Sequence, residues 1–405
     1  MLFPYESSKL ILMDLFNILF TFELMEIVSY IALSQTLFAI VLLASKRPKW
    51  VYDRILIAML IFIAWIIIGS LFRSANKFDL LFKNFNLVPF TISLIPLLYL
   101  YVRTSINENP RFQRKDLLHF IVPLILLLES IVIPGMYEIE EGLYLAPKIN
   151  VPTIIYNGIS LVFISVYIVI IFRKIRSHQK ELPNLFSFTS SRITLNWIKI
   201  VILLFVFNWV ITGLALAINV SVESQMIDPG LVFFINLGIF SFAISYFGFF
   251  QPSIFFAHKG SELVPEIRQA PAVETERTKY KKSSLTEERA TEYLERITAL
   301  LESERLYLQP DLTIQEISDK LEVPKHYLTE SLNTYMGKNF YTLINEYRII
   351  EFKKLAAEEK NKHLTLLALA YDSGFNSKSA FNLVFKKQTG ETPSQFLRTL
   401  RVEVQ

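Results

Sequence analysis

Two sets of polar side chains in this sequence stand where they could form hydrogen bonds with the edges of nucleic-acid bases. Each set opens a stretch with helical periodicity, one in residues 325–333 and the other in residues 377–382. In the major groove of DNA, lysine donates to guanine and asparagine pairs with adenine. Any single one of these residues could equally be a solvated surface position, so the prediction rests on the sets. The candidate base contacts are Lys325, His326, Thr329, Asn333, Ser377, Lys378, Ser379 and Asn382.

Catalytic and metal-binding chemistry lacks the residues that it needs. The chain of 405 residues contains no cysteine, which excludes a disulfide framework, a thiolate zinc site and a cysteine nucleophile. Its five histidines are scattered, and no glycine-rich loop is spaced to hold a phosphate. The sequence therefore predicts a protein that is not an enzyme and that holds no metal or cofactor.

The elements that would position the candidate base contacts are two short helix pairs. In the first pair, a helix over 313–321 leads through a turn into a helix over 325–336. In the second pair, a helix over 365–371 leads through a turn at Gly374 into a helix over 377–388. A tight turn sets two helices at roughly 90–120°, so that the second can enter the major groove while the first braces it. We predict two helix-turn-helix units.

Capping and packing signals agree with a small helical domain. The spacing Ser/Thr-x-x-Glu, in which two side chains cap a helix together, occurs at Ser284 and Thr313, and Thr392-Pro393 marks another helix start. Nothing in this region alternates like a strand. Six apolar residues of the two units are spaced to pack inwards: Val323, Leu328, Leu332, Phe375, Phe381 and Phe385.

The two units are separated in the chain and unequal in charge. A helix over about 340–358 would be about 28 Å long, near the roughly 34–36 Å of one DNA turn, so one chain could reach two successive major grooves. Basic residues concentrate in the second unit, where the candidate phosphate contacts are Lys386, Lys387 and Arg398. The region after residue 280 is nearly neutral overall. Homodimerisation or tethering at a membrane would then have to raise the affinity for DNA.

The run from Gly374 to Ser394 reads GFNSKSAFNLVFKKQTGETPS. This resembles the signature of the AraC/XylS family of bacterial transcription regulators, which has GF, then F-x-x-x-FKK, then G-x-TP-S. The resemblance extends over roughly 284–400. It implies a seven-helix domain that binds double-stranded promoter DNA, usually with RNA polymerase as partner. A hydrophobic half replaces the soluble effector domain that is commoner in the family, so no ligand class follows from the resemblance.

Seven apolar runs precede this domain, in a chain that is 52% hydrophobic. Each is long enough, or nearly so, for a bilayer core, which takes roughly 17–25 residues. The third run contains Pro89 and Pro96, which a spanning helix tolerates when its neighbours satisfy the freed backbone groups. We predict an all-α protein, a polytopic membrane helix bundle followed by a cytoplasmic double helix-turn-helix domain. The seven predicted spans are 27–45, 55–72, 87–102, 117–134, 153–172, 200–218 and 230–250.

Lysine and arginine are distributed unequally between alternate loops. The loops 46–54, 103–116 and 173–199 hold 14 of them, and the segments on the other side hold 5. Cytoplasmic loops carry the excess of basic residues. We therefore predict a multi-pass protein of the inner (cytoplasmic) membrane, with the N-terminus outside and the C-terminal domain in the cytoplasm.

The chain divides into an N-terminal extension (1–26), a seven-transmembrane-helix domain (27–256), a linker (257–283) and a DNA-binding domain (284–405). The extension has no basic region before an apolar run, so no cleaved signal peptide is predicted. Residues 10–22 are expected to be interfacial or disordered, because an eighth span would need a longer apolar run. The linker is charged and contains proline, as flexible tethers do.

Three polar side chains within the apolar runs share an estimated depth near the outer side of the membrane. Glu129, Asn157 and Asn236 could line an outward-facing sensor pocket. Alternatively, they could form hydrogen bonds between helices that stabilise the bundle.

These features together predict a membrane-anchored, sequence-specific DNA-binding transcription regulator that senses a signal through its membrane domain. The alternative is a membrane transporter or scaffold with a regulatory helical tail. The expected partners are double-stranded promoter DNA, RNA polymerase, the lipid bilayer and a second copy of the chain. The sequence does not identify the stimulus or the target promoter.

Overall fold

The computed structural model describes residues 5–47, 49–74, 88–107, 110–132, 151–190, 193–222, 228–251 and 285–403. The regular secondary structure of these ranges is helical, which agrees with the predicted all-α class. The helices group into two units. The first consists of Met1–Ile175 with Leu195–Phe255, and the second of Arg176–Thr194 with Phe256–Gln405.

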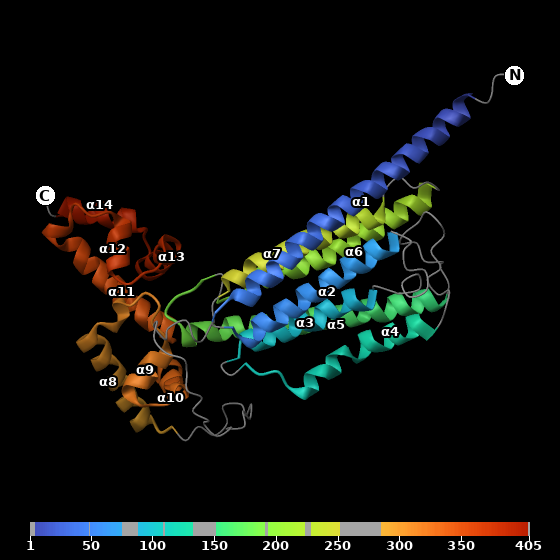
Figure 1. The fold of residues 1–405 in the computed structure, drawn as a ribbon. Coiled ribbons are helices and arrows are strands. Elements are labelled where there is room, and N and C mark those ends of the chain that lie inside the picture. Colours follow the sequence, from blue (N-terminus) through green and yellow to red (C-terminus); the bar gives the residue numbers. More distant parts are fainter. Residues whose placement is uncertain are drawn as a thin grey trace. The chain divides into compact units, whose positions relative to one another are not determined.

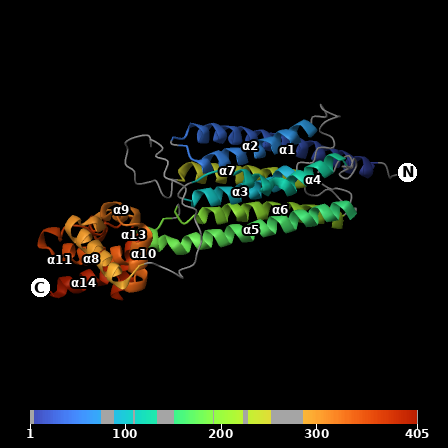
Figure 2. The ribbon, with the colours of Figure 1, turned by 90° about the horizontal axis from the view of Figure 1, so that it is seen from below.

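The first unit is a bundle of long apolar helices (Figure 1). Helix α1 packs along α7 and α2, α7 also packs on α6, and α3 packs on α2 (Figure 2). Side chains at these contacts are fully buried, among them Leu43, Leu56 and Ile244. The elements of the unit are α1 (Tyr5–Ser45), α2 (Val51–Ser74), α3 (Val88–Ser105), η1 (Arg114–Phe120), α4 (Ile121–Val132), α5 (Val151–Leu185), α6 (Asn196–Val222) and α7 (Pro229–Phe250). The last residues of α5, from Arg176 on, belong to the second unit.

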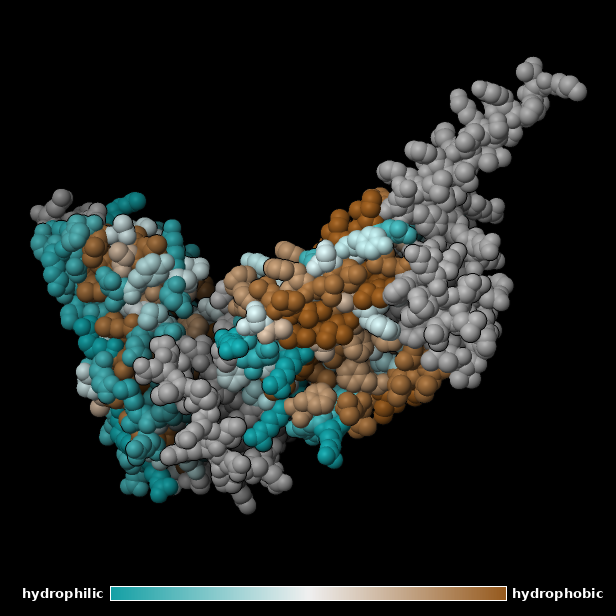
Figure 3. Space-filling view, viewed as in Figure 1, coloured by the Kyte–Doolittle hydropathy of each residue, from teal (hydrophilic) through white to brown (hydrophobic). Residues whose placement is uncertain are grey.

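Five segments of these helices are long and apolar enough to cross a membrane, and they correspond to the first, second, fifth, sixth and seventh predicted runs. Many of their outward side chains are apolar, and they form the brown areas of the surface in Figure 3. Phe38 and Leu203 are 68% and 66% exposed, and exposing such apolar surface to water would be unfavourable in free energy. The five segments are Leu24–Ser45, Val51–Leu71, Ile155–Leu185, Asn196–Asn219 and Pro229–Phe250.

The third and fourth predicted runs do not meet the same length and composition within the described residues. Helix α3 has 18 residues with Pro96 inside it, and most of its side chains are buried by neighbouring helices. The fourth run starts in the 3₁₀ segment η1, and the 12 residues of α4 extend only about 18 Å, short of the roughly 30 Å of a hydrocarbon core. The prediction of seven spans is therefore supported for five.

Residues 10–22, predicted to be interfacial or disordered, are helical and form the N-terminal part of the 41-residue helix α1. The alternative of disorder was therefore wrong, and an interfacial position stays a prediction, because the membrane-length segment of α1 begins at Leu24. No proline or glycine occurs between Tyr5 and Ser45, so no residue interrupts the backbone hydrogen bonds along this length.

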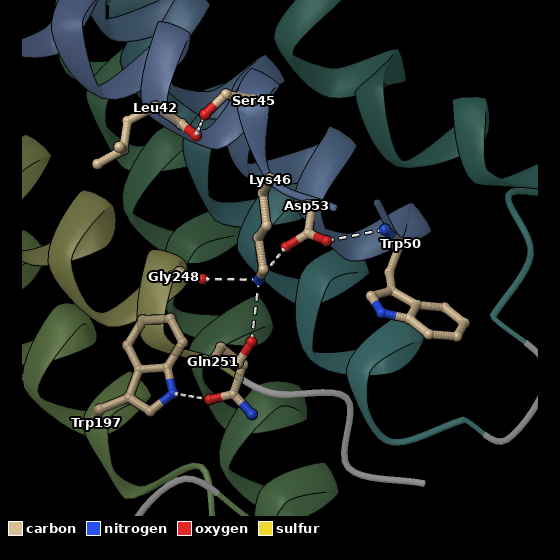
Figure 4. A network of polar contacts seen from close by, with 8 residues as sticks. All are labelled: Leu42, Ser45, Lys46, Trp50, Asp53, Trp197, Gly248 and Gln251. Carbon is tan, nitrogen blue, oxygen red and sulfur yellow. Dashed lines mark hydrogen bonds and ion pairs between the residues drawn. The ribbon is translucent and has the colours of Figure 1, made fainter. Parts of the chain in front are cut away.

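A polar cluster joins four helices at one end of the first unit (Figure 4). The Lys46 ammonium donates to Asp53 Oδ1 at 2.8 Å and to the carbonyl oxygen of Gln251 at 3.0 Å. The side chain of Gln251 accepts a hydrogen bond from Trp197 Nε1 at 3.0 Å. Asp53 is fully buried and also accepts from the Trp50 amide. The cluster thus fixes Gln251, the residue that follows α7, to α2 and α6.

The second unit contains, within its described residues, the seven α-helices that the family resemblance implied. They form two small apolar cores that share α11, whose first half packs in one core and whose second half packs in the other. The elements are α8 (Glu287–Glu304), η2 (Leu306–Leu308), α9 (Ile314–Leu321), α10 (Lys325–Glu330), η3 (Ser331–Tyr335), α11 (Phe340–Ala357), η4 (Glu359–Asn361), α12 (Leu366–Asp372), α13 (Lys378–Thr389) and α14 (Pro393–Glu403).

Two of the three predicted helix starts are confirmed. Thr313 and Glu316 form both hydrogen bonds of a capping box at α9, and Thr392 pairs in the same way with Gln395 at α14. The start predicted at Ser284 was wrong, because α8 begins at Glu287 and the hydroxyl of Thr286 accepts the hydrogen bond that caps it. Thr286 carries a hydroxyl group as Ser284 does, and it directly precedes the first residue of α8. Ser284 itself and the predicted linker 257–283 lie outside the described residues.

Candidate nucleic-acid interface

The six predicted packing residues are confirmed. Val323, Leu328 and Leu332 are at most 5% exposed and belong to the first core. The three phenylalanines of the second helix-turn-helix unit are at most 2% exposed, and their rings pack in tilted or T-shaped contacts with Phe352 of α11 or with each other. Burial of these aromatic rings fixes the orientation of α13, so its other face must point to solvent.

The exposed face of α13 carries the second set of candidate base contacts. Lys378, Ser379 and Asn382 are exposed. Ser377 is the N-cap of the helix, and its hydroxyl accepts a hydrogen bond from the Ala380 amide at 3.2 Å. Ser377 therefore caps the start of α13, the predicted recognition helix of this unit.

One residue of this face was missed by the sequence reasoning. Leu383 is 70% exposed, although it lies between Asn382 and the buried Val384. An apolar side chain in a major groove can contact the methyl group of thymine. A helical wheel of 378–389 would have found it, because the three buried positions of the wheel leave Leu383 on the polar side.

The first set of candidate base contacts is arranged less simply. Lys325 begins α10, and the ring of the exposed His326 lies 4.0 Å from that of Tyr327. Thr329 is half-buried, and the exposed Asn333 donates from Nδ2 to Asn184 Oδ1 at 3.2 Å. The predicted helix from Lys325 to about residue 336 is present, and from Ser331 to Tyr335 it widens into the π-helical segment η3.

The two helix-turn-helix units differ in whether their basic residues are paired with carboxylates, in the direction that the sequence predicted. In the first helix-turn-helix unit, Lys320 pairs with Glu304 at 2.6 Å and Lys338 pairs with Glu346 at 2.7 Å. Among the described residues, the exposed Lys386 and Lys387 of α13 and the exposed Arg398 of α14 have no such carboxylate partner. The second helix-turn-helix unit is therefore where we expect the stronger attraction for phosphates.

The turn of the second helix-turn-helix unit depends on Gly374. Its φ of +90° is unfavourable for residues with a side chain, and an added Cβ would lie 2.9 Å from Leu308 Cα and overlap the carbonyl oxygen of Tyr307. This close approach seats the second turn against η2 in the first half of the domain. The role that the sequence assigned to Gly374 is confirmed.

A buried arginine, also missed by the sequence reasoning, connects the two halves. Arg348 is 1% exposed, and its guanidinium donates to the carbonyl oxygens of Tyr307 at 2.8 Å and Gln309 at 2.7 Å. Its Cζ lies 5.9 Å from the centre of the Phe375 ring in the second turn. Burial lowers the pKa of Arg348 to about 10, which still leaves it charged at neutral pH. The sequence signal that could have revealed Arg348 is a cationic residue among apolar positions on one face of a helix.

The three candidate sensor residues are placed on separate helices of the first unit. Glu129 is half-buried on α4, and Asn157 is exposed on α5. The Asn236 amide donates to the Val232 carbonyl one turn earlier in its own helix, α7, at 2.8 Å. A pocket formed by the three remains a prediction.

The arrangement of two helix-turn-helix units agrees with what comparison finds. Residues 317–399 match a family model described as a helix-turn-helix domain. The C-terminal region therefore contains a helix-turn-helix domain. The chain is also similar to a protein of Pseudoalteromonas carrageenovora, an uncharacterised HTH-type transcriptional regulator in the cgkA 5′ region. That protein is 29% identical over 121 residues, which are 29% of this chain and 70% of the relative.

The matched residues of the helix-turn-helix domain run from α9 into α14 and include both recognition helices. Arg348 and Gly374, the two residues at which its halves meet, lie inside this range. No solved structure matches the chain.

Proposed function

We propose that this protein is a membrane-anchored transcription regulator that binds DNA sequence-specifically and responds to a signal through its membrane helices. The observation that carries the proposal is the solvent face of α13, where Lys378, Ser379 and Asn382 stand beside the unpaired Lys386 and Lys387. Polar groups that can read bases and cations that can hold phosphates occur there on one helix of a helix-turn-helix unit.

The first recognition helix would read a second half-site. Helix α11, between the units, has 18 residues and a length of about 27 Å, compatible with two successive major grooves. The expected base contacts there are Lys325, His326, Thr329 and Asn333. Promoter DNA, RNA polymerase and a second copy of the chain are the proposed partners.

Anchoring in the inner membrane is supported by the five membrane-length helices. The basic segments 46–54 and 173–199, the second of which starts in the last turns of α5, would lie on the same side whether α3 and α4 both cross the bilayer or neither does. Two crossings or none leave the side of α5 unchanged. The excess of lysine and arginine in these loops favours the cytoplasm for both. An odd number of spans then puts the N-terminus outside and the helix-turn-helix domain in the cytoplasm.

Genome-wide mapping of DNA sites occupied by the full-length protein in its own membrane tests the proposal. We expect discrete sites upstream of genes, and their loss with the double variant Lys378→Ala/Asn382→Ala. Gln388→Ala, an exposed uncharged position on the same helix, is the matched control and should leave the sites occupied. Site occupancy that is absent in the wild type would favour a transporter or scaffold with a helical tail.

A further inference from the structure

Residues 184–188, the last two residues of α5 and the first three of the loop that leads to α6, fold against the helix-turn-helix domain, and we call them the strap. Phe186 pairs with Thr313 in an isolated antiparallel bridge, and the Ser187 amide donates to the Leu312 carbonyl at 3.1 Å. Phe186 is 3% exposed, and Leu185 packs on the first core. The strap therefore docks at the start of α9 as an added element of this unit.

Ser187 is also a partner of the buried Arg348. Nη1 of Arg348 donates to the Ser187 carbonyl at 2.8 Å, and Nη2 donates to the Ser187 hydroxyl at 3.0 Å. The same carbonyl accepts from Asn345 Nδ2 at 3.2 Å. Among the described residues, the hydrogen-bond acceptors of this guanidinium are neutral oxygens, so each helps to compensate a charge that has been removed from water.

The strap thus binds the residue at which the two helix-turn-helix units meet. Arg348 reaches the first half of the domain through the carbonyls of Tyr307 and Gln309, and the second half through the Phe375 ring. If Ser187 leaves, Arg348 loses two of its hydrogen bonds, and the joint that sets the spacing of the recognition helices loosens.

The loop after the strap is closed onto α5. His178 Nε2 donates to the Ile193 carbonyl at 2.8 Å, and Gln179 Nε2 donates to the Thr194 carbonyl at 2.6 Å. Thr194 lies two residues before the start of α6. A shift of either α5 or α6 would therefore be transmitted to the strap over a few residues.

We propose that the strap couples α5 and α6 to DNA reading by holding the joint between the two helix-turn-helix units at Arg348. The inference rests on the proposed function. It assigns the relay to the loop between α5 and α6, in addition to the covalent connection that follows α7.

Docking is tested by cross-linking, which the absence of native cysteine makes clean. Asn184 and Asn333 are hydrogen-bonded side chains near the surface, so Asn184→Cys/Asn333→Cys should form a disulfide on oxidation of the full chain in native membranes. The control pair Asn184→Cys/Gln388→Cys should not. No disulfide in the first pair, with both thiols reactive to a maleimide, would overturn the docking of the strap. This test does not involve DNA, so it is independent of the proposed function.

Coupling is tested with the full chain in phosphatidylethanolamine–phosphatidylglycerol vesicles and a duplex enriched from a random library. We compare Kd for this duplex with Kd after one half-site has been scrambled. Ser187→Ala should reduce the advantage of the intact duplex at least about fivefold, whereas Thr189→Ala, an exposed position in the same loop, should keep it. An unchanged ratio with Ser187→Ala overturns the coupling. A wild type without sequence preference rejects the proposed function, and the coupling with it, while the cross-link still reports docking.

Discussion

Individual residues on α13 divide into those that can read a base and those that can hold a phosphate. Lys378 and Asn382 lie four residues apart on one face, and Lys386 and Lys387 follow at the C-terminal end of the helix. Hydrogen bonds to base edges depend on sequence, and charge contacts with phosphates do not. The two kinds of residue should therefore respond differently to mutation.

We expect Asn382→Ala to relax the preference at one base pair, because the paired amide contacts with adenine are lost, at a cost of about 1–3 kcal/mol in discrimination. Lys387→Ala should weaken all sequences alike and lower the slope of log K against log salt by about 0.9. Binding titrations of the full chain against a series of single-base substitutions, at several salt concentrations, measure both effects. Identical base profiles for Asn382→Ala and the wild type would reject this contact.

Gly374 is the residue at which a single added carbon should cost most. Gly374→Ala combines a strained φ with overlap of the Tyr307 backbone, and we expect a loss of more than about 2 kcal/mol in the stability of the domain. Gly337→Ala is the matched control, because Gly337 has a φ of +68° but open space around it, and it should cost about 1 kcal/mol. Thermal unfolding followed by helical circular dichroism gives both values, and equal losses would contradict the role of the close approach.

Among the elements, α1, α2, α6 and α7 are joined by the polar cluster of Lys46 and Asp53. Asp53→Asn should destabilise the first unit by about 1–3 kcal/mol, because the Lys46 ammonium, 17% exposed, would lose its counter-charge and keep only carbonyl partners. Fluorescence of Trp50 and Trp197 during denaturation in detergent follows the loss. Arg54→Gln changes an exposed charge in the neighbouring position of α2 and should have little effect. Equal stability of Asp53→Asn and wild type would mean that the cluster contributes no net energy.

At the scale of the whole molecule, the proposed topology makes a prediction about sides. A reporter fused after residue 256 should be active in the cytoplasm, and one inserted in the loop 135–152 should be active outside, because the basic loops face inwards. Reporter enzymes that work in only one compartment measure this. The reverse result would remove the proposed function with the topology, since DNA cannot be reached from outside the cell.

The sequence by itself determined what depends on local pattern. Capping spacings predicted the starts of α9 and α14, helical periodicity predicted the six packing residues, and apolar length predicted five of the helices that can span a membrane. Each of these features is set by residues close together in the chain. The same local reasoning predicted that the two helix-turn-helix units differ in charge, but it did not predict which of their lysines pair with carboxylates.

The tertiary structure alone decided what depends on residues far apart in the chain. The distance in sequence between Ser187 and Arg348 is 161 residues, and no local pattern indicates that their side chains meet. In the same way, Arg348 is a buried joint and not a surface charge because the loop at Tyr307 and the strap supply its acceptors. Leu56 and Ile244 are covered by neighbouring helices, while Leu203, of the same apolar type, is left outside. Burial and hydrogen-bond satisfaction are sums over spatial neighbours, and only the packed chain specifies who those neighbours are.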